Sequence, residues 1–312
     1  MRARTLALAA CVLVLAAAPL IAGAIGQMYY VELLRRVMIF GIAAASLNLI
    51  LGYGGLVSFG HAAYLGVGGY SVGILAFYGV NNGWLQWAVA ILASALVALA
   101  IGAISVRTRG IYFIMITLAF TQMLYYLGIS VEEYGGDDGL RIKVKSQFSG
   151  LIDLNDPVAY YYLVLALLLG VIYLVHRLVN SRFGMLLRAA RSNEARSRAI
   201  GFSPYPYQLA AFVLSGALCG LAGALYANHT AFITPEYMHW TRSGEIMFMV
   251  ILGGMGTAAG PALGAFALLI VEDLLAGWTQ HWQLILGPLL ILSVLYFKRG
   301  LAGLLPAGGK DG

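Results

Sequence analysis

Residues 47–64 read LNLILGYGGLVSFGHAAY, an apolar run interrupted by Gly52, Gly54, Gly55 and Gly60. Glycine lacks a Cβ, so it permits positive φ angles and the close approach of two backbones. It is also a poor helix former, and several glycines close together weaken a helix that the apolar residues would otherwise favour. The stretch therefore predicts an interrupted helix, and the surroundings of that interruption decide the fold.

The composition of the rest of the chain places this interruption in a membrane. Hydrophobic residues make up 61% of the chain and charged residues 10%, whereas a soluble domain carries about 25% charged residues. Apolar runs long enough to cross roughly 30 Å of hydrocarbon recur along almost the whole length, and no stretch is left for a soluble domain. The sequence predicts an all-α fold, a polytopic transmembrane helical bundle that forms a single domain over residues 1–312.

Apolar runs give an expected number of 8–10 membrane spans. One long run, Ser243–Ala276, is divided by glycines and counts as two pieces. The first run, Leu6–Ile25, also resembles a secretory signal peptide, with the small residues Ala22 and Ala24 near a cleavage point. The remaining runs are Val37–Leu51, Leu56–Tyr78, Trp84–Val106, Ile111–Ser130, Val158–His176, Tyr207–Asn228 and Trp282–Phe297.

The basic residues indicate the orientation. When the N-terminus is placed in the cytoplasm, 13 of the 19 Lys and Arg residues fall on the cytoplasmic side, as the positive-inside rule requires. Most acidic residues fall on the other side, although acids carry little weight in setting topology. We therefore expect both termini, and the loop over residues 179–206, to lie in the cytoplasm.

The chain contains a weak internal repeat. Val37–Leu51 is followed by the glycine cluster 52–55, and Ser243–Leu252 is followed by the glycine cluster 253–256. Glycine-interrupted segments at matching positions of two halves point to the substrate pathway of a transporter, although glycine also serves simply for close helix packing in lipid. The candidate residues for helix breaks and the pathway are Asn48, Gly52, Gly54, Gly55, Ser58, Gly60, His61, Gly253, Gly254 and Gly256.

Three polar side chains lie within the first interrupted run. The Ser58 hydroxyl and the His61 imidazole can satisfy backbone groups that a break leaves free. An ionisable group at membrane depth is also a functional candidate. Two roles are open for His61: a hydrogen bond inside the bundle that holds the break in shape, which we favour, and direct contact with the solute. For Asn48 we likewise favour a packing hydrogen bond over a pathway role.

Residues 182–201 form the longest positively charged segment of the chain. Their pattern predicts one short amphipathic helix that ends at Gly201. Glu194 precedes Arg198 by four residues, which favours an ion pair. Such a helix either lies on anionic lipid headgroups or inserts into a cleft of a cytoplasmic ATPase as a coupling helix. The candidate coupling residues are Arg188, Arg191, Glu194, Ala195, Arg198 and Gly201.

The same segment carries a family resemblance. Glu194-Ala195 followed by Gly201 resembles the Glu-Ala-Ala…Gly loop of binding-protein-dependent ABC importer permeases, in the LivM form of branched-chain amino acid transporters, although Arg196 replaces the second Ala. Three other segments are similar to that family in the same order: residues 47–64, 109–120 and 252–264. Together the four segments extend over most of the chain.

The resemblance implies an all-helical permease subunit of a bacterial inner membrane. It implies a second permease subunit of the LivH type, two cytoplasmic ATPase subunits and a periplasmic solute-binding protein as partners. Leucine, isoleucine and valine are the implied substrates, and other small solutes such as urea, short amides or aromatic acids stay open.

Neither catalysis nor a cofactor is expected. The sequence contains no Gly-x-x-x-x-Gly-Lys-Ser/Thr loop for nucleotide phosphates, so ATP hydrolysis is expected on another chain. Cys11 and Cys219 lie in apolar runs without a metal-ligand spacing, and the split distribution of basic residues argues against nucleic acid as a partner. A secondary transporter is the main alternative, but it normally carries charged groups within its spans, and these runs are nearly free of them. An integral-membrane enzyme is the second alternative, and it lacks a catalytic constellation here.

Overall fold

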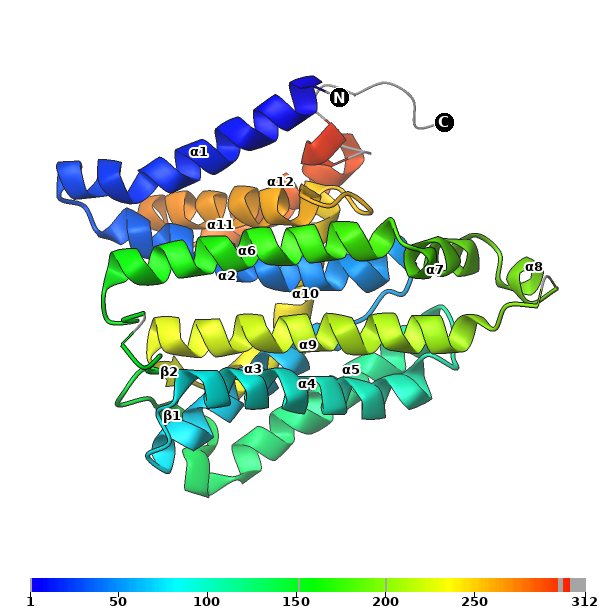
Figure 1. Ribbon diagram of the computed structural model, residues 1–312, viewed down its shortest axis with the longest axis horizontal. Coiled ribbons are helices and arrows are strands. Elements are labelled where there is room, and N and C mark those ends of the chain that lie inside the picture. Colours follow the sequence, from blue (N-terminus) through cyan, green and yellow to red (C-terminus); the bar gives the residue numbers. More distant parts are fainter. Residues whose placement is uncertain (1, 151, 200, 297–299, 304–312) are drawn as a thin grey trace.

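The computed structural model describes residues 2–150, 152–199, 201–296 and 300–303. Most of these residues are helical, and the helices run back and forth along the long axis of the molecule (Figure 1). The α-helices are α1 Arg2–Ile25, α2 Tyr29–Asn48, α3 His61–Phe77, α4 Gly83–Ser105, α5 Ile111–Ser130, α6 Pro157–Val179, α7 Arg182–Ser192, α8 Glu194–Ala199, α9 Pro204–Thr230, α10 Trp240–Gly253, α11 Gly260–Trp278 and α12 Trp282–Tyr296.

A few short elements complete the fold. A π-helix, Leu49–Tyr53, continues α2, and the strands β1 Leu140–Arg141 and β2 Phe232–Ile233 pair antiparallel. Short 3₁₀-helices are Glu132–Tyr134, Gly136–Asp138, Pro235–Met238 and Leu301–Gly303.

The helices confirm the predicted fold class. Each predicted apolar run contains a helix, and six helical segments are long and apolar enough to cross a membrane. These six segments are Tyr29–Tyr53, Gly83–Ser105, Ile111–Ser130, Pro157–Val179, Pro204–Thr230 and Gly260–Trp278.

Two helices beside the glycine clusters are shorter than a span. The predicted run Leu56–Tyr78 was too long, because α3 begins only at His61. With 14 residues, α10 measures about 21 Å at a rise of ~1.5 Å per residue, which is less than the roughly 30 Å of hydrocarbon. Helix α10 alone is therefore too short to cross the hydrocarbon, and the predicted run Ser243–Ala276 is not one continuous helix.

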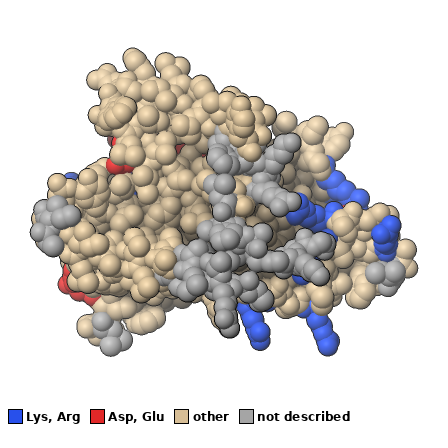
Figure 2. Space-filling model, turned by 90° about the horizontal axis from the view of Figure 1, so that it is seen from above, with Lys and Arg blue, Asp and Glu red and all other residues tan. Residues whose placement is uncertain are grey.

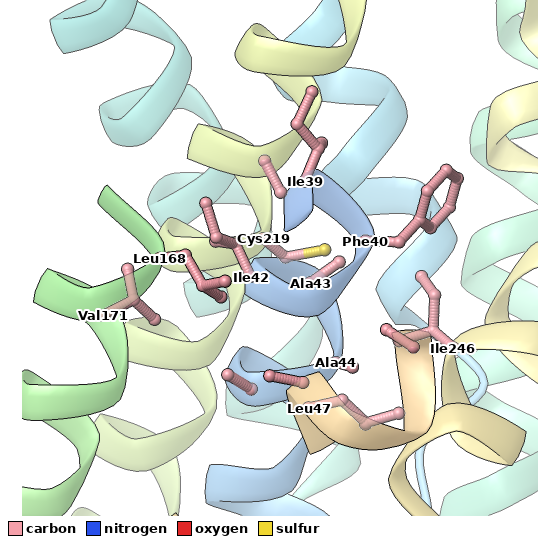
Figure 3. Close-up of a cluster of buried hydrophobic side chains, with 14 of the residues drawn as sticks. Ile39, Phe40, Ile42, Ala43, Ala44, Leu47, Leu168, Val171, Cys219 and Ile246 are labelled. Atoms are coloured by element: carbon pink, nitrogen blue, oxygen red, sulfur yellow. The ribbon is translucent and has the colours of Figure 1, made fainter. Parts of the chain in front are cut away.

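Helix α2 forms the centre of the bundle. Its apolar window is 83% buried, whereas that of α5 is 17% buried, so α2 is enclosed by other helices and α5 lies at the outside. Figure 3 shows side chains of neighbouring helices around Ile42 and Leu47 of α2: Leu168 and Val171 from α6, Cys219 from α9, and Ile246 from α10. An apolar helix with no lipid-facing side is surrounded by apolar partners on every face.

Small residues let α9 approach α3 closely. A Cβ placed on Gly223 of α9 would meet the backbone of Leu65 and Gly69 in α3, and one placed on Gly68 of α3 would meet the backbone of Gly220. Lipid tails are as apolar as leucine, so helices in a membrane gain from close backbone packing more than from apolar burial alone. These glycines hold α3 against α9.

Charge separates along the long axis of the bundle. Figure 2 shows the Lys and Arg side chains gathered mainly at the right-hand end, where α7 and α8 lie, and acidic side chains toward the opposite end. The two-stranded β1–β2 ladder lies at that opposite end (Figure 1). The ends of the molecule are therefore chemically different.

The contact between α3 and α9 predicts a specific effect on stability. Replacing Gly223 by Leu forces the two helices apart, and overpacking of this kind costs about 1–3 kcal/mol or more. We expect the purified Gly223→Leu protein to lose its monodisperse gel-filtration peak at a lower temperature than the wild type. Gly170→Leu is the matched control, because a Cβ at Gly170 of α6 would meet no atom within 4 Å. Equal thermal stability of the two variants would contradict the proposed contact.

Candidate functional site

The first glycine cluster breaks the chain between α2 and α3. The last turn of α2 widens into the π-helix Leu49–Tyr53 before the chain turns at Gly55, which has a φ of 72°. A side chain is strained at such a φ, whereas glycine adopts it freely. Gly54 lies close to its own helix, since a Cβ there would meet the Ile50 carbonyl oxygen at 2.6 Å. Short π-helical segments occur frequently at functional sites.

The second glycine cluster separates α10 from α11. Gly254 has a φ of 113° and Gly256 a φ of 76°, so both adopt a backbone conformation that favours glycine. A Cβ on Gly253 would meet the backbone of Gly260 at the start of α11. The two helices therefore meet at the break with their backbones in contact.

Asn48 joins the two breaks. Its Nδ2 donates to the Thr257 carbonyl oxygen at 2.9 Å, and its Oδ1 accepts from the Gly256 backbone N–H at 2.9 Å. Asn48 is fully buried. A Cβ on Gly52 would collide with the Asn48 amide and approach the Gly256 nitrogen. Two clusters that lie about 200 residues apart in sequence are thus in contact through one side-chain amide, which we call the Asn48 clamp.

Side chains satisfy the irregular backbone before α3. Ser58 Oγ accepts from the Gly60 N–H at 3.0 Å, and Thr117 Oγ1 accepts from the Phe59 N–H at 3.2 Å. Thr121 Oγ1 donates to the Phe59 carbonyl oxygen at 3.0 Å. In hydrocarbon no water can replace these partners, and each unsatisfied group costs several kcal/mol.

The two threonines belong to α5 and were missed as site residues. Their signal in the sequence is a pair of hydroxyls four residues apart on one face of an apolar helix. Ser243 of α10 was missed as well, and its Oγ accepts from the Ala62 N–H at 2.9 Å.

His61, the first residue of α3, is fully buried. Its Nε2 lies 2.7 Å from Ser215 Oγ of α9, and that hydroxyl donates to the Ser46 carbonyl oxygen of α2 at 2.5 Å. Since the Ser215 hydrogen points at Ser46, the imidazole Nε2 carries a proton and donates to Ser215. The imidazole Nδ1 has no hydrogen-bond partner among the described residues. His61 therefore joins three helices, and in this conformation it is closed off from solvent.

The segment expected to form one amphipathic helix forms two. Asn193 adopts an extended conformation, with a φ of −162°, between α7 and α8. Its Oδ1 accepts from the Arg196 N–H at 2.9 Å, as an N-cap side chain does. The prediction of a single helix was wrong because the Asn193 side chain starts a new helix there. Beyond α8, Gly201 has a φ of 88°, and a Cβ there would meet no described atom within 4 Å.

Arg191 of α7 reaches the first break. Its Nη1 donates to the Gly52 carbonyl oxygen, and a Cβ on Gly55 would meet the Arg191 Cγ at 2.8 Å. Arg188 donates from Nη2 to the Val179 carbonyl oxygen at the end of α6, at 3.3 Å. Helix α7 is thus attached both to the preceding helix and to the π-helix of α2.

Glu194 of α8 is paired within its own chain. Its Oε1 lies 2.7 Å from Nη2 of Arg198, the expected i,i+4 pair, and 2.5 Å from Nη2 of Arg109 in the α4–α5 loop. Ala195, the next residue, is exposed. The carboxylate thereby connects α8 to the residue that precedes α5 by two positions.

A buried arginine lies near the opposite end of the bundle. Arg35 of α2 is 3% exposed, donates from Nε to His229 Nδ1 at 2.9 Å, and lies 4.8 Å from the centre of the Tyr160 ring. Burial, together with the charge of Arg35, lowers the pKa of Lys145 in the α5–α6 connection. Arg35 lies outside the predicted run Val37–Leu51, whereas α2 begins at Tyr29 and includes it. Two ion pairs also lie within the helices: Arg36–Glu272 at 3.4 Å and Arg242–Glu245 at 2.8 Å.

Comparison with known proteins identifies the family of this chain. Residues 29–295 match the family described as branched-chain amino acid transport system / permease component. The chain is 30% identical over 295 residues to the high-affinity branched-chain amino acid transport system permease protein LivM of Salmonella typhimurium, which covers 87% of this chain and 69% of that protein. It is 25% identical to the probable LivM of Methanocaldococcus jannaschii, over 86% of this chain and 90% of that protein.

A second type of permease is also similar. LivH of Escherichia coli is 23% identical over 285 residues, 85% of this chain and 91% of that protein. No solved structure gives a significant match. The family match spans both glycine breaks, the Asn48 clamp and the α7–α8 segment. The chain therefore belongs to the family of permease components of branched-chain amino acid transport systems, and it is a multi-pass protein of the inner membrane.

Proposed function

We propose that this ABC-importer permease moves branched-chain amino acids into the cytoplasm. The relatives LivM and LivH are branched-chain amino acid permeases by name, and their resemblance to this chain supports the same solute class. Its partners would be a second permease subunit of the LivH type, two cytoplasmic ATPase subunits and a periplasmic solute-binding protein. Hydrolysis of ATP belongs to the ATPase subunits, since this sequence carries no phosphate-binding loop.

The end that carries α7 and α8 faces the cytoplasm in this proposal. The basic side chains gather at that end (Figure 2), and cytoplasmic segments of membrane proteins are enriched in Lys and Arg. The N-terminal end of α1 points in the same direction (Figure 1). The ATPase subunits would then dock on α7 and α8.

The proposed coupling of ATPase movement to transport rests on the contact of Arg191 with Gly52. A movement of α7 pulls directly on the carbonyl that the π-helix presents, and the Asn48 clamp passes that displacement to the second break. Helix α8 provides a parallel link, because Glu194 holds Arg109 beside α5, and α5 holds the Phe59 backbone through Thr117. Both halves of the coupling segment thus connect to residues 52–60, where alternating access would open and close the path.

Reconstitution tests the transport activity itself. Proteoliposomes that contain this chain, its partner subunits and the cognate binding protein should take up labelled leucine when ATP is supplied. Uptake should persist when the proton gradient is collapsed, because the driving force is ATP hydrolysis. Uptake that follows the proton gradient and ignores ATP would instead assign the chain to the secondary transporters.

The link through Arg191 predicts uncoupling. Arg191→Ala should lower leucine uptake at least tenfold while ATP hydrolysis continues, since a hydrogen bond from a charged donor contributes about 1.5–3 kcal/mol and each ~1.4 kcal/mol is a factor of ten. Arg182→Ala is the control, because it removes the same charge from the start of α7, away from the break. Normal uptake by Arg191→Ala would rule out this link.

The Asn48 clamp is tested with the same uptake assay. Asn48→Ala leaves the Gly256 N–H without its acceptor and should also abolish uptake, while the amount of permease in the membrane stays near that of the wild type. If Asn48→Ala transports normally, the clamp only contributes to packing.

The orientation predicts which positions react from outside. In a background with Cys11→Ser and Cys219→Ser, a membrane-impermeant thiol reagent applied to spheroplasts should modify Asn155→Cys and spare Ser192→Cys. Both positions are exposed on the protein surface, so a difference in labelling reports the side of the membrane. The reverse labelling pattern would invert the proposed topology.

A further inference from the structure

A basic cavity lies between α8 and the bundle. Its volume is about 300 Å³, and it opens among the end of α4, the α4–α5 loop, α8 and the start of α9. We call it the arginine pocket. Its lining residues are Val106, Arg107, Arg109, Glu194, Arg198, Tyr205 and Gln208.

The lining has an excess of positive charge. Three guanidinium groups and a single carboxylate, Glu194, line the pocket. Arg109 and Arg198 both pair with this carboxylate. Arg107 takes part in no ion pair between described residues and lies 5.4 Å from the centre of the Tyr205 ring. Because a guanidinium has five donors and Glu194 engages few of them, donors remain for a further anion.

The backbone adds to this positive potential. Arg109 precedes the first residue of α5 by two positions. The first N–H groups of a helix have no intrahelical acceptor and favour an anion. The three arginines and the start of α5 together favour a phosphoryl group, which Arg binds through paired hydrogen bonds.

Exposed apolar side chains precede and follow the pocket arginines in the sequence. Ile104 near the end of α4 is 54% exposed, and Ile111 and Tyr112 at the start of α5 are 71% and 76% exposed. These residues flank Arg107 and Arg109 in the sequence and continue onto α5, which is the least buried of the spanning helices. A ligand that fits both surfaces carries a phosphate at one end and hydrocarbon at the other.

We propose that the arginine pocket binds the phosphoryl headgroup of an anionic phospholipid, with the acyl chains lying along α4 and α5. A free phosphate or a nucleotide would use the arginines but not the apolar surface beside them. Basic pockets between helices at the cytoplasmic side are a known mode of anionic-lipid binding. The inference concerns this pocket alone and does not depend on the solute or on the coupling role of α7.

Glu194 competes with the lipid for the same donors. The carboxylate occupies Arg109 and Arg198, so an incoming phosphate shares them with Glu194 or displaces it. Removing the carboxylate charge should therefore strengthen lipid binding, whereas removing an arginine should weaken it. Opposite effects from residues of the same pocket are not expected if the variants only damage the fold.

Native mass spectrometry of the full-length chain, titrated with phosphatidylglycerol against phosphatidylcholine, measures this binding. Arg107→Gln and Arg109→Gln should each weaken phosphatidylglycerol binding about fivefold, as expected when one basic residue contributes about 1 kcal/mol near a membrane surface. Glu194→Gln should bind it more tightly than the wild type. Arg182→Gln is the control for loss of charge outside the pocket and should match the wild type.

Three outcomes would overturn the proposal. Wild-type affinity in the combined Arg107→Gln, Arg109→Gln variant would place the lipid elsewhere. Unchanged or weaker binding in Glu194→Gln, which keeps every arginine, would refute the competition even if the arginine variants failed to fold. Displacement of phosphatidylglycerol by an equal concentration of inorganic phosphate would show that a soluble anion is the ligand. Phosphatidylglycerol retained in excess phosphate, with the stated order of affinities, supports the lipid.

Discussion

A backbone group within a bilayer has no water to bind, and this constraint governs the centre of the molecule. Where α2 and α10 stop being regular helices, backbone hydrogen bonds satisfy some of the freed groups, and side chains from other elements satisfy others. Asn48 serves the second break, Thr117 and Thr121 serve the first, and Arg191 binds the π-helical carbonyl of Gly52. The partners come from α2, α5 and α7, so the irregular backbone requires the surrounding helices to be in place.

The same requirement connects the site to the surface. A polar partner that satisfies a break also follows its movement, because separating the pair leaves a buried group unpaired. Arg191 is such a partner on α7, and the Glu194–Arg109 pair extends the connection from α8 toward α5. In the proposed mechanism, an interaction that satisfies a buried group would thus also transmit movement. These contacts connect α7 and α8 with the centre of the bundle.

Hydropathy and glycine position predicted the helical fold, the positions of the helices and the two interruptions, because each signal lies within a short stretch of sequence. The contact between the interruptions was not predictable, since Asn48 and Gly256 are joined only by tertiary folding. The break at Asn193 was missed because the arginine periodicity runs through it, while a single side-chain cap outweighs that pattern. Arg35 was missed for a different reason: its buried partners, His229 and Tyr160, come from α9 and α6.

The β1–β2 ladder gives the two ends of the bundle different freedom. Leu140 pairs with Ile233, and a bridge between Asn82 and Gln147 joins the start of α4 to the same loop. The loop after α5 is therefore fixed to the start of α4 and to the residues that follow α9, all at the end away from α7 and α8 (Figure 1). A helix that is held at one end and displaced at the other tilts about the held end. Displacements of α4, α5 and α9 would consequently be smallest at the ladder and increase along each helix toward the end that carries α7 and α8.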